Sequence, residues 1–139
     1  MKYVLDASVA ARFLLHEELS EKAANVLEDF LRGEIDVLAP SLVIYEVGNA
    51  LWKAVRFGFI DKAEAASALD TFLKLNVWRN LKESELLDAI SLAVEKDITY
   101  YDAAYIALAK SERAILLTAD EGLIRKASGL VEAVHLKDY

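Results

Sequence analysis

The chain has 139 residues, of which 55% are hydrophobic, and its 23 acidic and 16 basic side chains give a formal net charge of −7. This length suits one domain, 1–139, with enough apolar residues for a single filled core. The acidic balance argues against broad, non-specific adhesion to nucleic acid, which needs clustered Lys and Arg. A nucleic-acid substrate stays open, because acids that bind divalent cations become a phosphate-binding surface.

Cysteine is absent, which excludes disulfides, thiolate zinc sites and a cysteine nucleophile. Any metal must then have oxygen ligands or the two histidines. The sequence lacks a run of about 18 apolar residues, the length that a membrane span needs. Asp6 interrupts the first apolar stretch, where a signal peptide needs continuity. We therefore expect a cytoplasmic protein with no membrane partner.

Apolar runs and helical spacing predict an alternation of strands and helices. In chain order these are a strand at 2–5, a short helix capped by Ser8, a helix at 21–31, a strand at 36–39, a helix opened by Pro40 and Ser41 that runs to Gly58, a helix that starts at an Asp61–Glu64 capping box, helices at 83–96 and 100–112, a strand at 114–118, a short helix at 121–128 and a strand at 131–136. In the helix at 83–96, the residues expected to face inward are Leu86, Leu87, Ile90 and Val94. This alternation predicts a mainly parallel sheet of about four or five strands with helices on both faces.

Four acidic side chains occupy positions that a parallel sheet brings to one edge. Asp6 and Asp120 each follow a predicted strand directly. Glu46 lies about one and a half turns into a helix that starts at the same edge. The helix with Asp102 in its first turn runs back against the strand that follows it, so this acid is also expected at the carboxyl edge. Sites in α/β proteins lie at that edge.

Carboxylates that converge repel each other unless a positive charge lies among them. Mg²⁺ and Mn²⁺ prefer carboxylate oxygen and water, and the sequence has no Cys or paired His to suggest zinc. We therefore predict a magnesium or manganese site formed by the four acids. Asp102 also has a structural alternative, which is a capping box with Thr99 at the start of its helix.

Three uncharged polar side chains are predicted to lie close to these acids. Ser8 and Thr118 are placed to bind metal-bound water or a phosphate oxygen. Asn49 lies one turn beyond Glu46 on the same helix face. Each has a structural alternative: Ser8 as a helix cap, Thr118 as the end of a strand and Asn49 as polar filling.

Four short motifs carry a resemblance to a known family. They are Leu5-Asp6-Ala7-Ser8, Glu46-Val47-Gly48-Asn49-Ala50-Leu51, the stretch from Tyr101 to Ala109, and Leu117 to Asp120. In these motifs, their order and their spacing, the chain resembles the PIN-domain ribonucleases over nearly its whole length. Within that family it is most similar to the VapC-like toxins of prokaryotic toxin–antitoxin pairs. The resemblance implies a three-layer α/β/α PIN-like fold.

The resemblance also implies an activity. It implies an endoribonuclease, dependent on Mg²⁺ or Mn²⁺, that cleaves RNA phosphodiester bonds with metal-activated water. Asp6, Glu46, Asp102 and Asp120 would hold the metal directly or through water. The implied partners are RNA, a small antitoxin that covers the acidic pocket with an apolar helix or extended arm, and a second copy in a homodimer. The apolar helices between Asp61 and Lys96 are the expected partner surface.

Other conspicuous side chains receive simpler interpretations. Arg12 is the best basic candidate for guiding RNA, because it lies closest in sequence to the first acid. Trp52 and Trp78 could stack on bases, but Trp52 has core-compatible helical spacing, and we favour packing for both. His16 and His135 lack ligand spacing and are expected at the surface or at strand ends.

Alternative functions stay open. One is a phosphatase that forms an aspartyl-phosphate at Asp6, although the chain lacks the second Asp two residues on that the haloacid-dehalogenase type uses. Another is a non-catalytic, metal-binding interaction module, which would bind divalent ions without turnover. The sequence also fits a solitary RNA-processing PIN nuclease that has no antitoxin.

Overall fold

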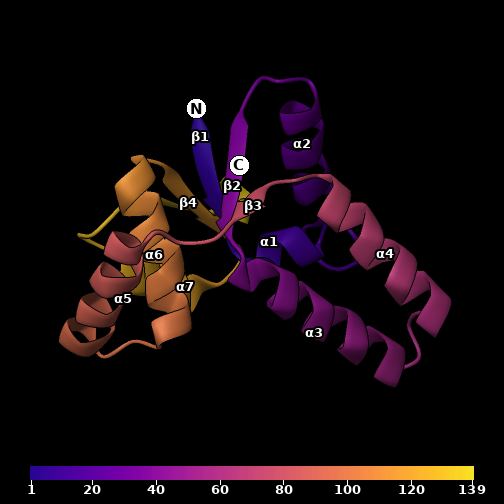
Figure 1. Ribbon diagram of the computed structural model, residues 1–139. Helices are drawn as coiled ribbons and strands as arrows, with labels where there is room; N and C mark the ends of the chain where they lie inside the picture. The colour runs from indigo at the N-terminus through magenta and orange to yellow at the C-terminus, as the bar shows by residue number, and fades with distance from the viewer.

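The computed structural model describes residues 1–139 as a five-stranded sheet between two layers of helices (Figure 1). All paired strands are parallel, in the order β3-β2-β1-β4-β5. In chain order the elements are β1 (Lys2–Leu5), α1 (Ala7–Ala11), α2 (Ser20–Leu31), β2 (Asp36–Pro40), α3 (Leu42–Arg56), α4 (Lys62–Lys74), β3 (Trp78–Arg79), α5 (Glu83–Lys96), α6 (Tyr100–Glu112), β4 (Ile115–Thr118), α7 (Glu121–Ala127), β5 (Ala133–His135) and the 3₁₀ turn η1 (Leu136–Asp138). The predicted α/β/α architecture is confirmed.

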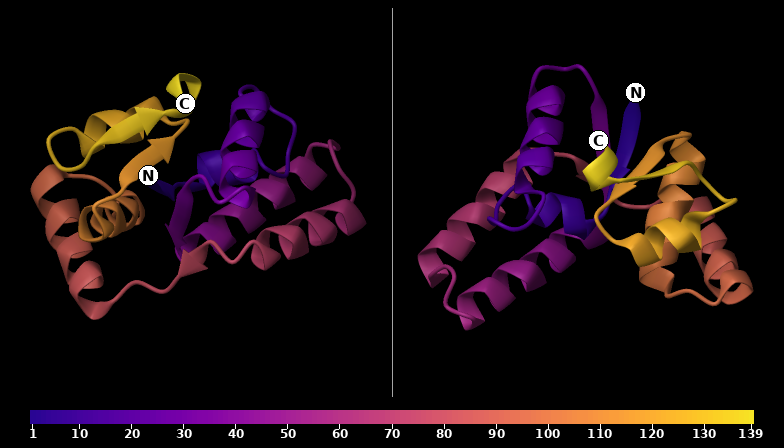
Figure 2. Two further views of the ribbon diagram at one scale, coloured as in Figure 1. Left: turned by 90° about the horizontal axis from the view of Figure 1, so that it is seen from above. Right: turned by 180° about the vertical axis from the view of Figure 1, so that it is seen from behind.

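The two halves of the chain lie on opposite faces of the sheet. From β1, the next strands β2 and β3 are added toward one edge of the sheet. The chain then returns past β1, and β4 and β5 are added toward the other edge. Because crossovers between parallel strands are right-handed, this reversal moves the later helices to the other face. Helices α1 to α4 therefore cover one face and α5 to α7 the other, as the views in Figures 1 and 2 show.

The reversal creates a topological switch point between β1 and β4. These two strands are neighbours, with Leu5 opposite Leu117, but the segments that leave them diverge to opposite faces. Such a point leaves space for a site at the carboxyl ends of the strands. Asp6 directly follows β1, and Thr118 is the last residue of β4. Two predicted site residues therefore lie at the switch point.

The core explains why the central elements have such apolar sequences. Val4, Leu5, Leu116 and Leu117 of the central strands are fully buried, because helices cover both faces of the sheet. Helix α6 is buried at every position from Ala103 to Ala109, since it lies between the sheet and α5. Small alanines let these layers approach closely.

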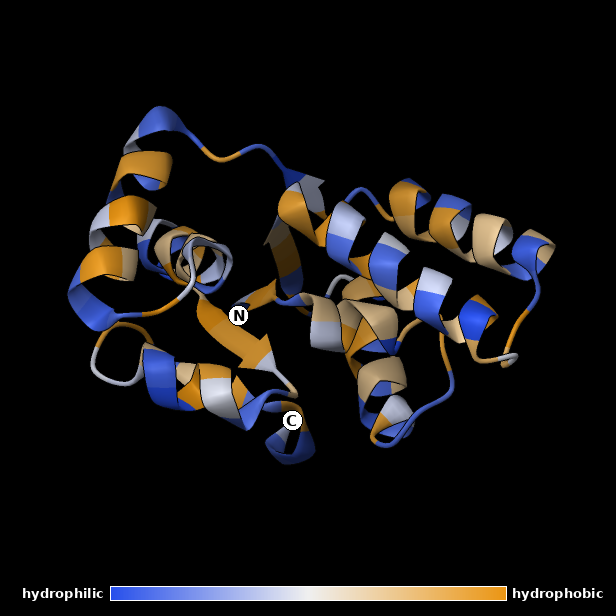
Figure 3. Cartoon of the chain, turned by 90° about the horizontal axis from the view of Figure 1, so that it is seen from below, coloured by the Kyte–Doolittle hydropathy of each residue, from blue (hydrophilic) through white to orange (hydrophobic).

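Helix α5 is oriented differently from the prediction. Its buried residues are Glu85, Ala89 and Leu92, which face α6. The four residues predicted to point inward are 42% to 75% exposed; they are Leu86, Leu87, Ile90 and Val94. The prediction was wrong because packing against α6 takes up the side of α5 that carries Ala89, Leu92 and one buried acid, which leaves the other apolar side chains outside. Figure 3 shows the hydrophobic bands along α5.

Helices α3 and α4 form a hairpin that projects from the sheet (Figure 1). Asp61 starts α4 with the predicted capping box, in which the Glu64 N–H donates to Asp61 Oδ1 at 2.7 Å. Trp52 on α3 does not pack in the core as predicted; it is 54% exposed, with the Arg56 guanidinium 5.5 Å from its ring centre. Trp78, in the unpredicted two-residue strand β3, packs against the core.

The histidines lie where the sequence suggested. His16 is exposed in the loop after α1, and His135 ends β5, with Nε2 3.1 Å from the Ala119 carbonyl oxygen. Across the thirteen elements, no helix combines the length and apolar content that a bilayer crossing requires.

Candidate active site

Asp6 is the central side chain of the site. It follows β1, caps α1 and is only 6% exposed. Its carboxylate accepts hydrogen bonds from the Ser8 N–H at 3.1 Å, the Val9 N–H at 3.3 Å, the Ser8 hydroxyl at 2.6 Å and the Thr118 hydroxyl at 2.6 Å. Hydroxyl and amide donors from β4 and α1 therefore fix both carboxylate oxygens.

Ser8 does not cap α1, contrary to the prediction. Asp6 takes that position because a carboxylate one residue before the helix can accept from the free N–H groups of the first turn. The Ser8 hydroxyl instead accepts the Ala119 N–H at 2.8 Å while donating to Asp6. It ties the start of α1 to the end of β4, directly beside the switch point.

The charge of Asp6 has no cationic partner. Burial raises its pKa to about 6, against the hydrogen bonds from Ser8 and Thr118 that lower it, and the nearby charge of Asp120 raises it further. None of the ion pairs in the protein includes Asp6, Glu46 or Asp120. A buried carboxylate beside a second acid is a place where a positive ion would be stabilised.

Asp120 lies on the other side of the switch point. Its N–H donates to Thr118 Oγ1 at 3.0 Å, and its exposed carboxylate accepts the Gly122 N–H at 2.8 Å to cap α7. A Cβ at position 122 would lie 3.0 Å from Asp120 Oδ1, so glycine leaves the space that this carboxylate needs. The Thr118 hydroxyl thus donates to the Asp6 carboxylate and accepts from the backbone N–H of Asp120.

Glu46 reaches the site from α3. Its Oε1 accepts a hydrogen bond from the Tyr105 hydroxyl of α6 at 2.7 Å. Tyr105 is 2% exposed, and burial together with the charges of Glu46 and Asp6 raises its pKa well above the usual value. The phenol therefore stays protonated and donates. Sequence reasoning did not single out Tyr105; the available signal was a tyrosine one turn after Asp102 in an alanine-rich helix.

Asp102 lies in the first turn of α6, as predicted, but only half of its proposed capping box forms. Its N–H donates to Thr99 Oγ1 at 3.1 Å. The Asp102 carboxylate does not accept the Thr99 backbone N–H, which would complete the capping box. It pairs instead with Lys126 of α7, with Nζ 2.8 Å from Oδ2. The pKa of Lys126 is raised mainly by its hydrogen bond to Asp102 and also by the charge of Asp120, so Lys126 interacts with both acids. No pattern in the sequence indicated this lysine.

An open cleft of about 530 Å³ adjoins the acids on the side of α1 and α3. Ser8, Glu46 and Asn49 line it, so Asn49 shares the surface of Glu46 as predicted. Arg12 lines it too, held by hydrogen bonds to the carbonyl oxygens of Ser8 at 2.6 Å and Glu18 at 2.8 Å. The remaining polar and aromatic wall is formed by Glu17, Tyr45, Lys53 and Tyr101.

The four acids lie at one edge but do not form a closed set of ligands. No three Asp, Glu or His side chains are close enough together to surround a metal ion in this arrangement. Asp120 is turned toward its helix cap and Asp102 toward Lys126. The donor chemistry nevertheless suits a hard cation, because every candidate ligand atom is an oxygen and the buried acid lacks a counter-charge.

Two of the curated proteins that this chain matches come from Pyrobaculum aerophilum. The chain is 37% identical over 137 residues to ribonuclease VapC3 of Pyrobaculum aerophilum, covering 94% of this chain and 98% of the relative. It is 38% identical over 95 residues to exonuclease VapC9 of the same organism, covering 68% and 70%.

Solved structures share the fold. PAE2754 from Pyrobaculum aerophilum matches with a TM-score of 0.70 and 32% identity, over 99% of this chain and 93% of that one. A toxin–antitoxin complex from Klebsiella pneumoniae contains a chain that matches with a TM-score of 0.68 and 15% identity, over 99% of both chains. The PIN domain model matches residues 3–129, which include all four acids of the switch-point edge. This chain therefore belongs to the PIN-domain family, in which it is similar to proteins named VapC.

Proposed function

We propose that this protein is a divalent-metal-dependent endoribonuclease and the toxin of a toxin–antitoxin pair. The observation that carries the proposal is Asp6, a buried acid at the switch point of a PIN fold that hydroxyl and amide donors hold in place but no cation neutralises. A relative with 37% identity over nearly the whole chain is named a ribonuclease.

The residues proposed to hold Mg²⁺ or Mn²⁺ are Asp6, Glu46, Asp102 and Asp120. When bound, the cation supplies Lewis acidity toward the scissile phosphate and lowers the pKa of a water molecule. The chain contributes fixed carboxylates: Ser8 and Thr118 orient Asp6, and an acid of the set is available to accept the proton of the attacking water.

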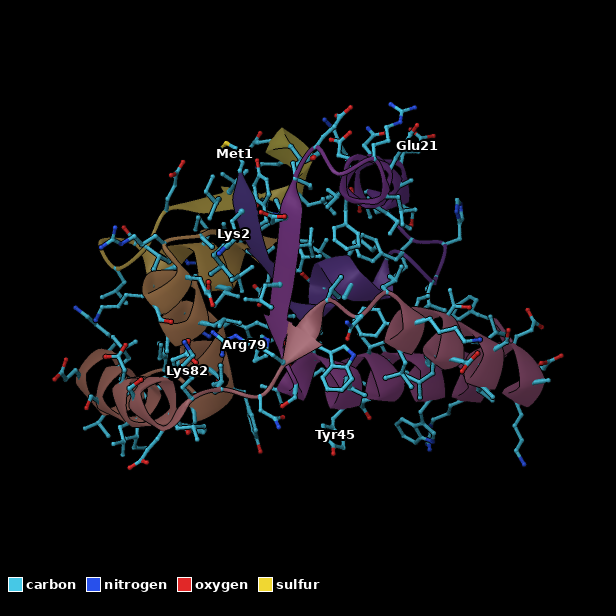
Figure 4. The ribbon with its side chains drawn as sticks, turned by 45° about the horizontal axis from the view of Figure 1, so that its top comes forward. Met1, Lys2, Glu21, Tyr45, Arg79 and Lys82 are labelled. Carbon is cyan, nitrogen blue, oxygen red and sulfur yellow. The ribbon has the colours of Figure 1, made fainter.

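The cleft beside Glu46 supports a single-stranded RNA substrate. Arg12 and Lys53 supply positive charge there in a protein that is acidic overall. Tyr45 and Tyr101 line the same cleft and are 77% and 62% exposed; Figure 4 shows Tyr45 pointing away from the body of the protein. Aromatic rings beside cations are the usual means of binding unpaired bases and their phosphates.

Two apolar surfaces support the proposed protein partners. The four exposed residues of α5 (Leu86, Leu87, Ile90 and Val94) provide a surface for a second copy. A groove of about 790 Å³ beside the cleft, lined by Leu14, Leu15, Phe57, Phe59 and Ile60, suits the apolar segment of an antitoxin. Light scattering on the purified protein should give twice the monomer mass, and Leu87→Glu should return it to the monomer.

Cleavage of matched linear and circular single-stranded RNAs tests the enzymatic proposal. With Mn²⁺ we expect the wild type to cut both, because an endonuclease needs no free end, and EDTA to stop the reaction. Asp6→Asn should reduce cleavage at least about 100-fold, since even losing a group that only orients a metal ligand costs up to about that factor. Asp70→Asn is the matched control, because this exposed acid lies on α4 and pairs with Lys74.

Other outcomes would select other functions. Shortening of the linear RNA alone would favour an exonuclease, the activity named for the relative with 38% identity. A folded wild type that binds Mn²⁺ but leaves both RNAs intact would favour a non-catalytic module. Cleavage that survives in Asp6→Asn would contradict the assignment of the site.

A further inference from the structure

One hydrogen bond joins the two helical layers across the site. Tyr105 of α6 donates to Glu46 of α3 at 2.7 Å, and the two helices belong to opposite faces of the sheet. The phenol is nearly inaccessible, whereas Glu46 lines the open cleft. The bond therefore runs from the core outward to the wall of the site.

Tyr105 is the sole partner of the Glu46 carboxylate. Glu46 forms no ion pair, and its side chain makes no other hydrogen bond. A glutamate has three rotatable side-chain bonds, so an unattached carboxylate would sample several positions in the cleft. Anchoring Oε1 restricts that movement of a side chain that lines the cleft and leaves Oε2 without a hydrogen-bond partner.

The hydroxyl of Tyr105 is not required for packing. Its ring lies in the main hydrophobic core, where a phenylalanine ring would fill the same volume. A buried hydroxyl costs free energy unless it finds a partner, and here the partner is an acid of the site. Tyr105 also lies one turn after Asp102, so α6 delivers both an acid and a phenol to the same edge.

We propose that Tyr105 is a positioning residue that fixes Glu46 for cation binding. This inference rests on the proposed function, because it takes Glu46 to be a metal ligand. Loss of a residue that hydrogen-bonds to a metal ligand commonly weakens metal binding about 10-fold to 100-fold. The phenol itself touches neither the metal nor the RNA in this role.

Mn²⁺ titration by calorimetry tests the inference without measuring cleavage. Tyr105→Phe should bind Mn²⁺ about 10-fold more weakly than the wild type, with its fold checked by thermal unfolding. The matched control is Tyr139→Phe, which removes another phenol-to-carboxylate bond, to Asp29, far from the site. This control should bind Mn²⁺ like the wild type.

A double-mutant comparison separates the possible failures. In a Glu46→Gln background, adding Tyr105→Phe should cause no further loss, because the phenol acts through Glu46. Unchanged Mn²⁺ affinity in Tyr105→Phe, or a full additional loss in the double variant, would overturn the positioning role while leaving the metal site intact. A wild type that binds no Mn²⁺ would overturn the proposed function and this inference together.

A second variant covers the case in which Tyr105→Phe fails to fold. Glu46→Asp has a side chain too short to reach the phenol and should show the same weakening of Mn²⁺ binding. Wild-type Mn²⁺ affinity in Glu46→Asp would overturn the inference.

Discussion

The protein buries two acidic side chains, Asp6 and Glu85, and surrounds them in opposite ways. Glu85 of α5 is 3% exposed and receives two bonds from the Arg79 guanidinium, at 2.7 and 2.9 Å. Ser111 and the Lys82 N–H also donate to it, and Arg79 lowers the pKa of Glu85 to about 2. Asp6, by contrast, has only neutral donors, and burial raises its pKa to about 6.

The environment of Glu85 is that of a structural acid. Arg79 also binds Glu112 at 2.7 Å, and Lys2 reaches the same Glu112 at 2.9 Å. This cluster joins β1, β3, α5 and α6, and Figure 4 shows Lys2 and Arg79 on the side of the sheet that carries those helices. Complete pairing makes Glu85 part of the fold, whereas the missing counter-charge at Asp6 marks a site that would gain from a cation.

The largest expected difference between the two acids is in the free energy of unfolding when each is replaced. Glu85→Gln leaves the partly buried Arg79 without its main partner and should lower the free energy of unfolding by about 3 kcal/mol. Urea unfolding at pH 7 measures this change. Because Glu85 ionises more readily in the folded state, the difference from the wild type should shrink as the pH falls from 4.5 toward about 2.

The same variant should keep its RNA cleavage per folded molecule, since Glu85 lies outside the candidate site. Loss of cleavage in the folded fraction, or an unfolding free energy equal to that of the wild type, would remove the distinction between the two acids.

The next effect concerns pH and has the opposite sign. The pKa of Asp6 is raised in the folded state, so its contribution favours folding at low pH and is lost as the pH rises from 3.8 through about 6. In EDTA, Asp6→Asn should therefore be more stable than the wild type by up to about 3 kcal/mol above pH 6, with little advantage near pH 4.

Thermal unfolding of both proteins from pH 4 to pH 8 measures this advantage. Saturating Mn²⁺ should reduce it, because the cation stabilises the wild type. A constant difference across the pH range would contradict the raised pKa of Asp6.

The smallest effect concerns Lys126, the only cation paired with an acid of the site. Lys126→Met removes a positive charge that competes with a divalent ion for Asp102. Because this pair is partly exposed, its removal should tighten Mn²⁺ binding only about threefold. Lys110→Met, which breaks a comparable Lys–Asp pair between α6 and α5, is the control and should leave Mn²⁺ affinity unchanged.

Weaker Mn²⁺ binding by Lys126→Met would assign Lys126 a supporting role in the metal site. In that case the contrast between paired and unpaired acids would not extend to Asp102.

Local patterns were sufficient to predict most elements. Apolar runs located β1 and β4, and the Asp61–Glu64 box located the start of α4, because these signals depend on neighbouring residues. The carboxyl-edge positions of Asp6 and Asp120 also follow from chain order in a parallel sheet.

Tertiary packing decided what local patterns could not. Periodicity identified an apolar stripe on α5 but not which side of that helix would meet α6, so Leu86, Leu87, Ile90 and Val94 were assigned to the core. The same limit applies to Trp52, whose spacing on α3 fits a core position equally well.

The sequence by itself determined the order of all elements except β3, the parallel sheet and the placement of the four acids toward its carboxyl edge. The three-dimensional structure alone decided which groups surround each acid: Thr118 at Asp6, Tyr105 at Glu46 and Lys126 at Asp102. These partners lie 24 to 112 residues from their acids in the chain. The physical reason is that the charge of a carboxylate is controlled by neighbours in space, which only the packed layers bring together.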